Sequence, residues 1–393
     1  MQPTKYIVES TKYSDDYKTP VLTAGKSFIK GYTNEIEGVF DNLPTIIFDD
    51  FTTATQFVNF KFKVKSSAMK ILVPTSKLVN MIFAYHYMQV HQVRSDTHKR
   101  YWISVYAKMK ILLPSLAEQN AIVAKIEELF SSLDSGIADL KKAQGQLVIY
   151  RQAVLKKAFE GEFDIKRLGE VSIVKRGKSK HRPRNDKSLF GGKYPFIQTG
   201  EIRVANGGII TKYKNTYSEK GLAQSKLWPK GTLCLTIAAN IGETAFLGFE
   251  ACFPDSVVGI VPDKDLLNDL FLNYYIQKIK KEMDYKASAT AQKNINVAFL
   301  DALEIPLPSI KKQHQIVQEI ESRLSVCDKV EESIVESLEK SKALRQSILK
   351  KAFEGRLLNE QELAACKAAP DYEPASVLLK RIKAEKGSVK KKK

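Results

Sequence analysis

The chain has 393 residues, 44% of them hydrophobic, and a formal net charge of +18. This length is too great for one ordinary core and suits two domains, while the apolar content excludes wholesale disorder. The sequence has no apolar run of transmembrane length, and its start, MQPTKYIVES, lacks a signal-peptide pattern, so we expect a cytoplasmic protein.

The positive charge is concentrated in two long segments. Residues 1–110 and 164–304 carry net charges of +6 and +7, whereas 111–163 and 305–357 carry −1 and +2, and 358–393 carries +4. A polyanionic partner that touches the two long segments explains this distribution. Ordinary solubility from surface lysines explains it as well, so charge alone leaves both alternatives open.

Short β-rich runs alternate with glycine-bearing turns in both long segments. Strands are expected at 45–51, 57–65 and 69–74 in the first segment, and at 231–239, 244–249 and 256–262 in the second. A helix follows in each, at Leu78–Val90 and at Leu266–Tyr285. Each segment is therefore predicted to be a small mixed α/β, β-rich domain.

A long helix follows each predicted domain, and the two helices are copies of one unit. With Pro114 set against Pro308, an offset of 194, 18 of the 50 residues at 114–163 are identical to their counterparts. The run LKKAFEG occurs in both copies, each of which ends at a glycine, Gly161 or Gly355. Such identity indicates an internal duplication.

Both copies carry a seven-residue apolar repeat with polar interruptions, which predicts a coiled-coil seam. The seam positions are Ile126, Leu133, Leu140, Leu147 and Val154 in the first copy, and Ile320, Ile334 and Ile348 among those of the second. A helix from Glu118 to Phe159 would be roughly 60 Å long. We expect the two helices to pack antiparallel on each other, with leftover apolar surface for a partner; the alternative is two unrelated surface helices.

The densest cluster of cations lies in the second long segment, in the run VKRGKSKHRPRNDK. Its basic residues are Lys175, Arg176, Lys178, Lys180, Arg182, Arg184 and Lys187. So many cations in one loop suit contact with phosphates, and we favour DNA contact over an ordinary solvated loop. Three polar stretches, at 49–57, 98–102 and 198–208, are interpreted as loops that could supply contacts to base edges, or as ordinary surface loops.

Motifs of common enzymes are absent from the sequence. Gly-Lys-Ser occurs at Gly25–Ser27 and Gly177–Ser179, but the upstream glycine of a phosphate-binding loop is missing. Asp49 and Asp50 with Lys65 could be imagined as a nuclease metal site, although a structural pair at a strand end is the stronger interpretation. The four cysteines lack metal-ligand or paired spacing and are expected to be buried thiols. We therefore expect a protein without catalytic activity and without a metal site.

Nearly the whole chain resembles the specificity (S) subunits of type I restriction-modification enzymes. The similarity rests on LPSLAEQNAIVAKIEELF and IPLPSIKKQHQIVQEIESRL, on RQAVLKKAFEGEF and RQSILKKAFEGRL, and on EPASVLLKRIKAEK in the tail. It implies an α+β architecture in which two target recognition domains are separated by an antiparallel coiled coil with an internal pseudo-twofold repeat. It also implies that each domain reads one half of a bipartite DNA sequence, in host defence against foreign DNA.

The resemblance further implies partners and cofactors. Two methyltransferase (modification) subunits and motor-nuclease (restriction) subunits would assemble on this chain. S-adenosylmethionine, ATP and magnesium would be bound by those subunits, for DNA methylation and cleavage, with none bound here.

Domain boundaries follow from the repeat. We expect a first recognition domain at 1–113, a first conserved helix at 114–163, a second recognition domain at 164–307, a second conserved helix at 308–357 and a tail at 358–393. FDIKRLGEV opens the second recognition domain, whereas the first begins without such a run and is expected to lack its opening strand. A missing strand would leave a sheet edge exposed.

The residues expected to contact DNA form two groups. They are Lys175, Arg176, Lys178, Lys180, Arg182, Arg184 and Lys293 in the second domain, and Lys26, Lys65, Ser66, Lys99 and Arg100 in the first. Partner contacts are expected along the seam, at Ile126, Leu133, Leu140, Leu147, Val154, Ile320, Ile334 and Ile348. The rival hypothesis is a coiled-coil adaptor whose basic globules bind RNA or acidic protein.

Overall fold

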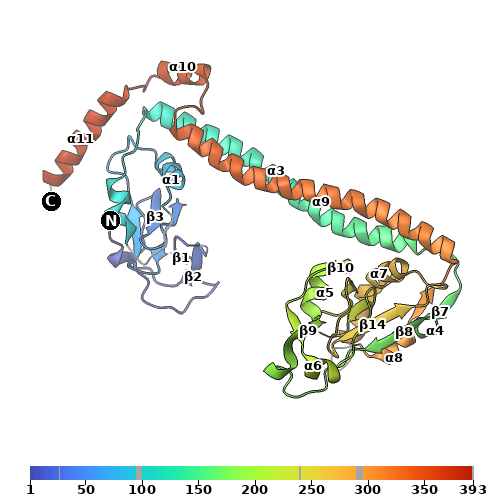
Figure 1. Cartoon of the computed structure of the whole chain (residues 1–393). Coiled ribbons are helices and arrows are strands. Elements are labelled where there is room, and N and C mark those ends of the chain that lie inside the picture. Colours follow the sequence, from blue (N-terminus) through green and yellow to red (C-terminus); the bar gives the residue numbers. More distant parts are fainter. Residues whose placement is uncertain (26, 94–99, 239, 289–294, 392–393) are drawn as a thin grey trace. The chain divides into compact units, whose positions relative to one another are not determined.

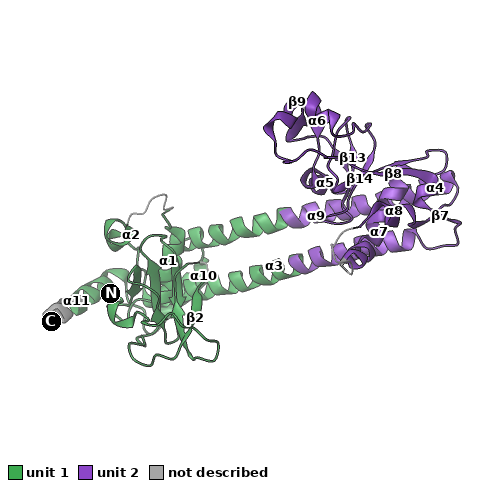
Figure 2. Ribbon diagram, turned by 90° about the horizontal axis from the view of Figure 1, so that it is seen from below, with its two compact units in different colours: residues 1–140, 336–393 green, residues 141–335 purple. Residues whose placement is uncertain are grey.

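The computed structural model describes residues 1–25, 27–93, 100–238, 240–288 and 295–391. It divides into two compact units, residues 1–140 with 336–393 and residues 141–335 (Figure 2). The long helices α3 (Leu116–Ala158) and α9 (Ile310–Phe353) run through both units, so each unit holds a globular part and one half of each helix (Figure 1). The predicted class, mixed α/β globules with two long helices, is confirmed.

The globular part of the first unit contains two small sheets. One has the order β4 (Thr55–Val58), β3 (Thr45–Asp49), β6 (Met69–Leu72), and the other β2 (Ile29–Thr33), β1 (Thr19–Leu22), β5 (Lys63–Val64). Short helical segments are η1 (Thr4–Tyr6), α2 (Tyr101–Ser104) and η2 (Tyr106–Lys108), and α1 (Met81–Val90) packs near β3 and β4. The helices α10 (Glu360–Ala368) and α11 (Ala375–Lys391) also belong to this unit.

The single strand predicted at 57–65 is wrong. β4 ends at Val58, Phe62 forms an isolated bridge with Phe40, and β5 pairs in parallel with β1 of the other sheet. Phe62 and Phe40 are fully buried in one apolar cluster, so packing of this stretch under the second sheet interrupts the strand.

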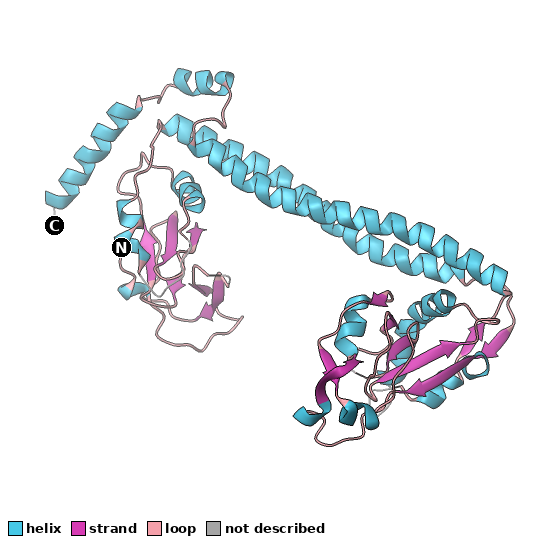
Figure 3. Cartoon of the chain, in the orientation of Figure 1, coloured by secondary structure: helices cyan, strands magenta, loops and turns pink. Residues whose placement is uncertain are grey.

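The globular part of the second unit is built on a five-stranded sheet (Figure 3). Its order is β10 (Ile209–Ile210), β13 (Thr244–Leu247), β12 (Leu233–Thr236), β14 (Val257–Pro262), β8 (Ser172–Arg176). Two strand pairs flank it, β9 (Phe190–Phe196) with β11 (Asn215–Tyr217) and β7 (Ile165–Arg167) with β15 (Glu304–Pro306). The helical segments are α4 (Leu168–Val171), η3 (Lys187–Leu189), α5 (Thr199–Ala205), α6 (Glu219–Ala223), α7 (Asp269–Ser288) and α8 (Val297–Asp301).

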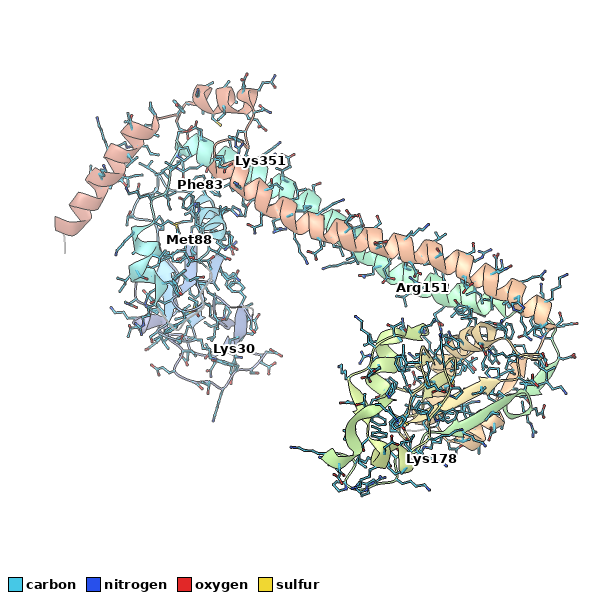
Figure 4. The ribbon with its side chains drawn as sticks, in the orientation of Figure 1. Lys30, Phe83, Met88, Arg151, Lys178 and Lys351 are labelled. Atoms are coloured by element: carbon cyan, nitrogen blue, oxygen red, sulfur yellow. The ribbon has the colours of Figure 1, made fainter. Side chains whose placement is uncertain are left out.

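In each unit the start of one long helix packs on the end of the other, which makes the helices antiparallel there. In the first unit, Ile126 of α3 and Ile348 of α9 share a cluster with Phe83 of α1 (Figure 4 labels Phe83). In the second unit, Ile320 of α9 and Leu155 of α3 share a cluster with Phe271 of α7. The apolar seam thus also fastens each globule to its helix pair.

A buried glutamine joins each globule to its long helix. Gln119, fully buried, accepts a hydrogen bond from the backbone N–H of Asn80 (2.8 Å) and donates from Nε2 to the carbonyls of Leu78 (3.2 Å) and Pro114 (3.0 Å). Gln313, its counterpart 194 residues on, accepts from the N–H of Asn268 (2.8 Å) and donates to the carbonyls of Leu266 and Pro308 (both 2.8 Å).

Each of these glutamines therefore satisfies three partly buried backbone groups where its globule meets its helix pair. Asn80 and Asn268 in turn cap the first turn of α1 and α7 respectively, by accepting hydrogen bonds from Phe83 N and Phe271 N. The same junction is thus built twice from identical residue types.

Two further sequence expectations can be compared with the structure. Cys234, Cys252, Cys327 and Cys366 are all buried and free, as predicted. Within the described part of the chain, no helix combines the length and the apolar character needed to cross a membrane.

Replacing Gln119 by alanine should destabilise the first unit by about 3 kcal/mol or more, because buried backbone groups lose their partners. Gln313→Ala should do the same in the second unit. Hydrogen exchange of the amides of Asn80 and Asn268, with thermal unfolding, measures each unit separately. Gln146→Ala, an exposed position on α3, serves as the control and should change stability by less than about 0.5 kcal/mol. Equal protection of Asn80 in wild type and Gln119→Ala would contradict this account.

Candidate DNA-contact surface

The basic loop, residues 177–186, connects β8 to η3 in the second unit. Lys178 lies at the margin of the globule, on the side away from the long helices (Figure 4). The loop leaves the sheet at Gly177, whose N–H donates to Val257 O (2.8 Å). A Cβ at this position would come within 2.3 Å of the carbonyl of Pro254, so glycine is required for the backbones to approach this closely.

Arg182 and Arg184 of this loop, and Arg176 at the end of β8, hold its shape. The Nη2 of Arg184 lies 2.6 Å from a carboxylate oxygen of Asp255, and the Nε of Arg176 donates to the carbonyl of the same aspartate. Arg182 donates from Nη1 to the carbonyls of Ser179 (2.8 Å) and His181 (2.9 Å). These side chains are exposed, but part of their hydrogen-bonding capacity is used within the protein.

An aspartate fixes the far end of the loop. Asp186 accepts hydrogen bonds from the N–H and the hydroxyl of Ser188 (2.9 and 2.8 Å) and lies 2.8 Å from Nε2 of His181. Together with the charge of Lys220, these contacts lower the pKa of the Asp186 carboxyl to about 2, the Ser188 hydrogen bonds contributing most. The carboxylate is therefore ionised at neutral pH and links His181 to Ser188.

The lysines of this surface are exposed and can contact a partner. Lys175, Lys178 and Lys180 are exposed, and among the described residues none of them forms an ion pair. A lysine that the sequence interpretation missed belongs with them: Lys226, whose Nζ lies 3.8 Å from the centre of the Trp228 ring. Partial burial lowers the pKa of Lys226, as do the charges of Lys175 and Lys178, so these lysines share one surface.

The segment that carries Lys226 also holds the loop in place. Gln224 accepts a hydrogen bond from the N–H of His181 (3.1 Å), and the hydroxyl of Ser225 donates to Lys178 O (2.8 Å). Two buried donors here, Nε2 of Gln224 and Nε1 of Trp228, have no partner. The sequence signal was a polar run beside an aromatic residue, QSKLW at 224–228, which resembles many surface segments.

The other residues expected to contact DNA are either described in the first unit or outside the described residues. Lys26, Lys99 and Lys293 lie outside the described residues. Lys65 and Ser66 are exposed in the first unit, directly after β5. Arg100 precedes α2 in the same unit, with its guanidinium carbon 5.7 Å from the centre of the Phe51 ring.

The interpretation of 198–208 as a loop is wrong, because α5 occupies Thr199–Ala205. Glu201 accepts a hydrogen bond from the N–H of Gln198 (3.2 Å), which starts the helix, and Asn206 ends it in the left-handed conformation (φ 44°). This reciprocal capping was present in the sequence as a glutamine followed three residues later by a glutamate.

Asp49 and Asp50 have structural roles, as favoured from the sequence. Asp49 accepts from the N–H groups of Phe51 and Thr52 (both 2.9 Å), which shapes the turn. Asp50 is buried, accepts from the N–H of Trp102 (2.7 Å) and pairs with Lys70 (3.3 Å). Across the described ranges, no group of three or more His, Cys, Asp or Glu side chains is placed to bind a metal ion.

The seam residues lie in the helix pair itself. Ile126, Val154, Ile320, Ile334 and Ile348 are buried, and Leu133, Leu140 and Leu147 are half-buried. Ion pairs at positions related by 194 border the seam: Arg151 with Asp328 (2.6 Å) in the second unit, and Arg345 with Asp134 in the first. Figure 4 labels Arg151 on α3. The apolar side chains that remain exposed on the helices are others, including Val148, Ile149, Val326 and Val335.

The double variant Lys178→Ala, Lys226→Ala should weaken binding to duplex DNA and flatten its salt dependence, because each lost phosphate contact removes about 0.9 from the slope of log K against log salt. Equilibrium binding between about 50 and 200 mM salt measures the slope. Lys166→Ala, which removes the same charge from β7, is the control and should leave the slope unchanged. An unchanged slope in the double variant would exclude this surface from the DNA contact.

Comparisons with known proteins agree with these features. A family model described as the type I restriction modification DNA specificity domain matches residues 160–340. The EcoR124I/EcoR124II specificity subunit of Escherichia coli is 31% identical over 371 residues, with 88% of each chain covered. The EcoBI specificity subunit of Escherichia coli is 26% identical over 312 residues, covering 70% of this chain and 64% of that protein.

Two solved structures share the fold. The HsdS subunit of Thermoanaerobacter tengcongensis has a TM-score of 0.54 at 22% identity, covering 80% of this chain and 81% of that one. A chain from a study of complex assembly and conformational transition of the type I restriction-modification system has a TM-score of 0.71 at 19% identity, covering 91% and 97%. With the sequence relatives, these observations establish that the chain belongs to the family of type I restriction-modification specificity subunits, the DNA-recognition components, which are not themselves catalytic.

Proposed function

We propose that this chain reads a bipartite DNA target for a type I restriction-modification complex, one half of the target with each globule. The observation that carries the proposal is the repeated junction, in which Gln119 and Gln313 make equivalent contacts between a globule and its helix pair. Equivalent junctions would give the chain an approximate internal twofold relation. A duplex with two half-sites is the partner that such a relation suits.

In the second recognition domain, the lysines of the basic loop and Lys226 would contact phosphates. Phosphate contacts set the register of a protein on DNA, and polar groups beside them read base edges. Gln224 and Ser225 hold the loop through hydrogen bonds with His181 and Lys178, which supports a contact surface there.

The same role is assigned to the remaining candidates of both domains. In the first domain these are Lys65, Ser66 and Arg100, which the structure describes, and Lys26 and Lys99, which it does not. In the second domain the remaining candidates are Lys175, Arg176, Arg182 and Arg184, which are exposed, and Lys293, which lies outside the described residues.

The helix pair would be the platform for two modification subunits and, through them, the motor-nuclease subunits. The seam residues at Ile126, Val154, Ile320 and Ile348 would maintain this platform, since their side chains are already covered. The exposed apolar side chains on the same helices, Ile149 (71% exposed) foremost, would make the contact. S-adenosylmethionine, ATP and magnesium would be bound by those partners, and the complex would work on DNA in the cytoplasm.

The rival function, an adaptor whose basic globules bind RNA or acidic protein, predicts no preference between DNA sequences. The chain together with its modification subunits should bind duplexes selected from a random pool at least about 10³-fold more tightly than random duplex. Competition with structured RNA and with an acidic polypeptide in the same assay distinguishes the alternatives. Equal affinity for selected and random duplexes would favour the adaptor.

Ile149→Asp should weaken assembly with the modification subunit at least tenfold, because it places a charge in an apolar contact. Gel filtration and titration calorimetry of the two purified proteins measure this. The control is Gln146→Asp, an exposed polar position one turn earlier on α3. Normal assembly of Ile149→Asp would remove this face of α3 from the partner contact.

A further inference from the structure

Each globule carries a pair of aromatic rings at its surface, packed edge to face. In the first unit, the ring centres of Phe28 and Phe60 lie 6.1 Å apart and the ring planes meet at 62°. In the second unit, those of Tyr213 and Phe249 lie 5.1 Å apart and meet at 71°. The DNA contacts assigned above to the basic loop and Lys226 include none of these four residues.

The two aromatic pairs occupy the same place in the fold. Phe60 lies two residues before the residue that forms an isolated antiparallel bridge with Phe40. Phe249 likewise lies two residues before the residue that forms an isolated antiparallel bridge with Trp228. Phe40 and Trp228 are both buried, so each bridge fixes one ring of a pair against the core of its globule.

The other ring of each pair comes from the segment that leads into a neighbouring strand. Phe28 directly precedes β2, which pairs antiparallel with β1, and Tyr213 lies two residues before β11, which pairs antiparallel with β9. β1 also pairs in parallel with β5, directly after the first bridge, and Phe196 of β9 forms a parallel bridge with Cys252, directly after the second. The same segments therefore meet in the same order, although neither pair is related to the other by the offset of 194.

In each pair one ring is anchored and the other is exposed. Phe28 packs against the apolar cluster of its globule, whereas Phe60 is 36% exposed. Phe249 packs against the cluster that contains Trp228, whereas Tyr213 is 47% exposed. An exposed ring that is held edge to face by an anchored one has a defined orientation, so little side-chain freedom is lost when a partner covers it.

Exposed lysines accompany both pairs. Four of them lie within two residues of a ring: Lys30 and Lys61 in the first unit, and Lys212 and Lys214 in the second. Among the described residues none of the four forms an ion pair. Glu250 is the one acidic residue within two positions of any of these rings. Lys30 lies on the side of its globule away from the long helices, as Lys178 does in the second unit (Figure 4).

In both globules the aromatic pair is linked to the candidates for DNA contact by a short segment. Residues 60–66 lead from the first pair to Lys65. Residues 249–255 lead from the second pair to Asp255, which pairs with Arg184 of the basic loop. Six residues span at most about 20 Å. This is less than one helical turn of a duplex, about 34 Å, so one duplex can touch both places on a globule.

We propose that each aromatic pair and its lysines form a second DNA contact of their recognition domain, one that holds the sugar-phosphate backbone without reading bases. The proposal rests on the proposed function. The lysines pair with phosphates, and the exposed ring packs on the deoxyribose between them. Half-sites of different sequence have only the backbone in common. An arrangement that recurs in both domains is therefore suited to the part of the target that both halves share.

The test uses the chain assembled with its modification subunits. Tyr213→Ala and Phe60→Ala should each weaken binding of selected and of random duplex by the same factor, at least about fivefold, so that the ratio of the two affinities stays that of the wild type. Tyr285→Ala, at a 79% exposed position on α7, is the control and should change neither affinity. A changed ratio would mean that the ring reads bases, and unchanged affinities would mean that it does not touch DNA. Either result overturns the proposal.

A second set of variants removes charge and leaves the packing of the rings intact. The double variants are Lys30→Ala with Lys61→Ala, and Lys212→Ala with Lys214→Ala. Each should flatten the slope of log K against log salt by about 1.8, because two phosphate contacts are lost. Lys166→Ala on β7 is the control and should leave the slope unchanged. A wild-type slope in either double variant contradicts a role that both domains share.

The same measurements separate this proposal from its alternatives. If the wild-type complex binds selected and random duplex equally, the proposed function fails. If the wild-type complex discriminates between them and the variants bind as it does, only the second contact fails. Weaker assembly of Tyr213→Ala with the modification subunit, at unchanged DNA affinity of the assembled complex, would assign the aromatic pair to a protein contact and overturn the proposal.

Discussion

The structure depends on one polar interaction, the buried side-chain amide that joins each globule to the first turn of a long helix. Gln119 and Gln313, which are themselves fully buried, each satisfy one amide and two carbonyls. An apolar residue could fill the volume but would leave these backbone groups unpaired, at a cost of about 1–3 kcal/mol each. Because the amide has donors and acceptor on a rigid plane, it also fixes the direction in which the globule meets the helix.

A recognition subunit needs this rigidity, since a contact surface can only read DNA if its scaffold holds it in register. In the second unit, some residues around the basic loop hold its shape and others are left for contact with a partner. Asp255 and Asp186 restrain Arg184 and His181, and this leaves the lysines of the loop and Lys226 free for a polyanion. Arginine suits the restraining role because its planar fork forms directed hydrogen bonds, whereas lysine contributes a mobile point charge.

Sequence reasoning found the long helices, most strands and the basic loop, because periodicity, glycine stops and charge are local signals. It failed where the structure depends on contacts between residues that are far apart in the sequence. The pairing of Arg184 with Asp255 joins positions 71 apart, so the charge count could not separate structural from available cations. The strand at 57–65 was interrupted by packing of Phe62 against Phe40, and Lys226 gave no signal beyond a neighbouring aromatic residue. Gln119 and Gln313 were visible as an identity in the repeat, but their hydrogen bonds to segments about 40 residues away were not.

The central claim is that this chain determines which DNA sequence a methyltransferase complex modifies. Mapping methylated adenines genome-wide tests it most directly. Cells that contain the chain and its modification partner would be compared with cells in which the gene is deleted. The account predicts a bipartite motif with two specific halves and a fixed spacer that disappears on deletion and returns on complementation. An identical methylation map in the presence and absence of the gene, with the protein expressed and assembled, would contradict it.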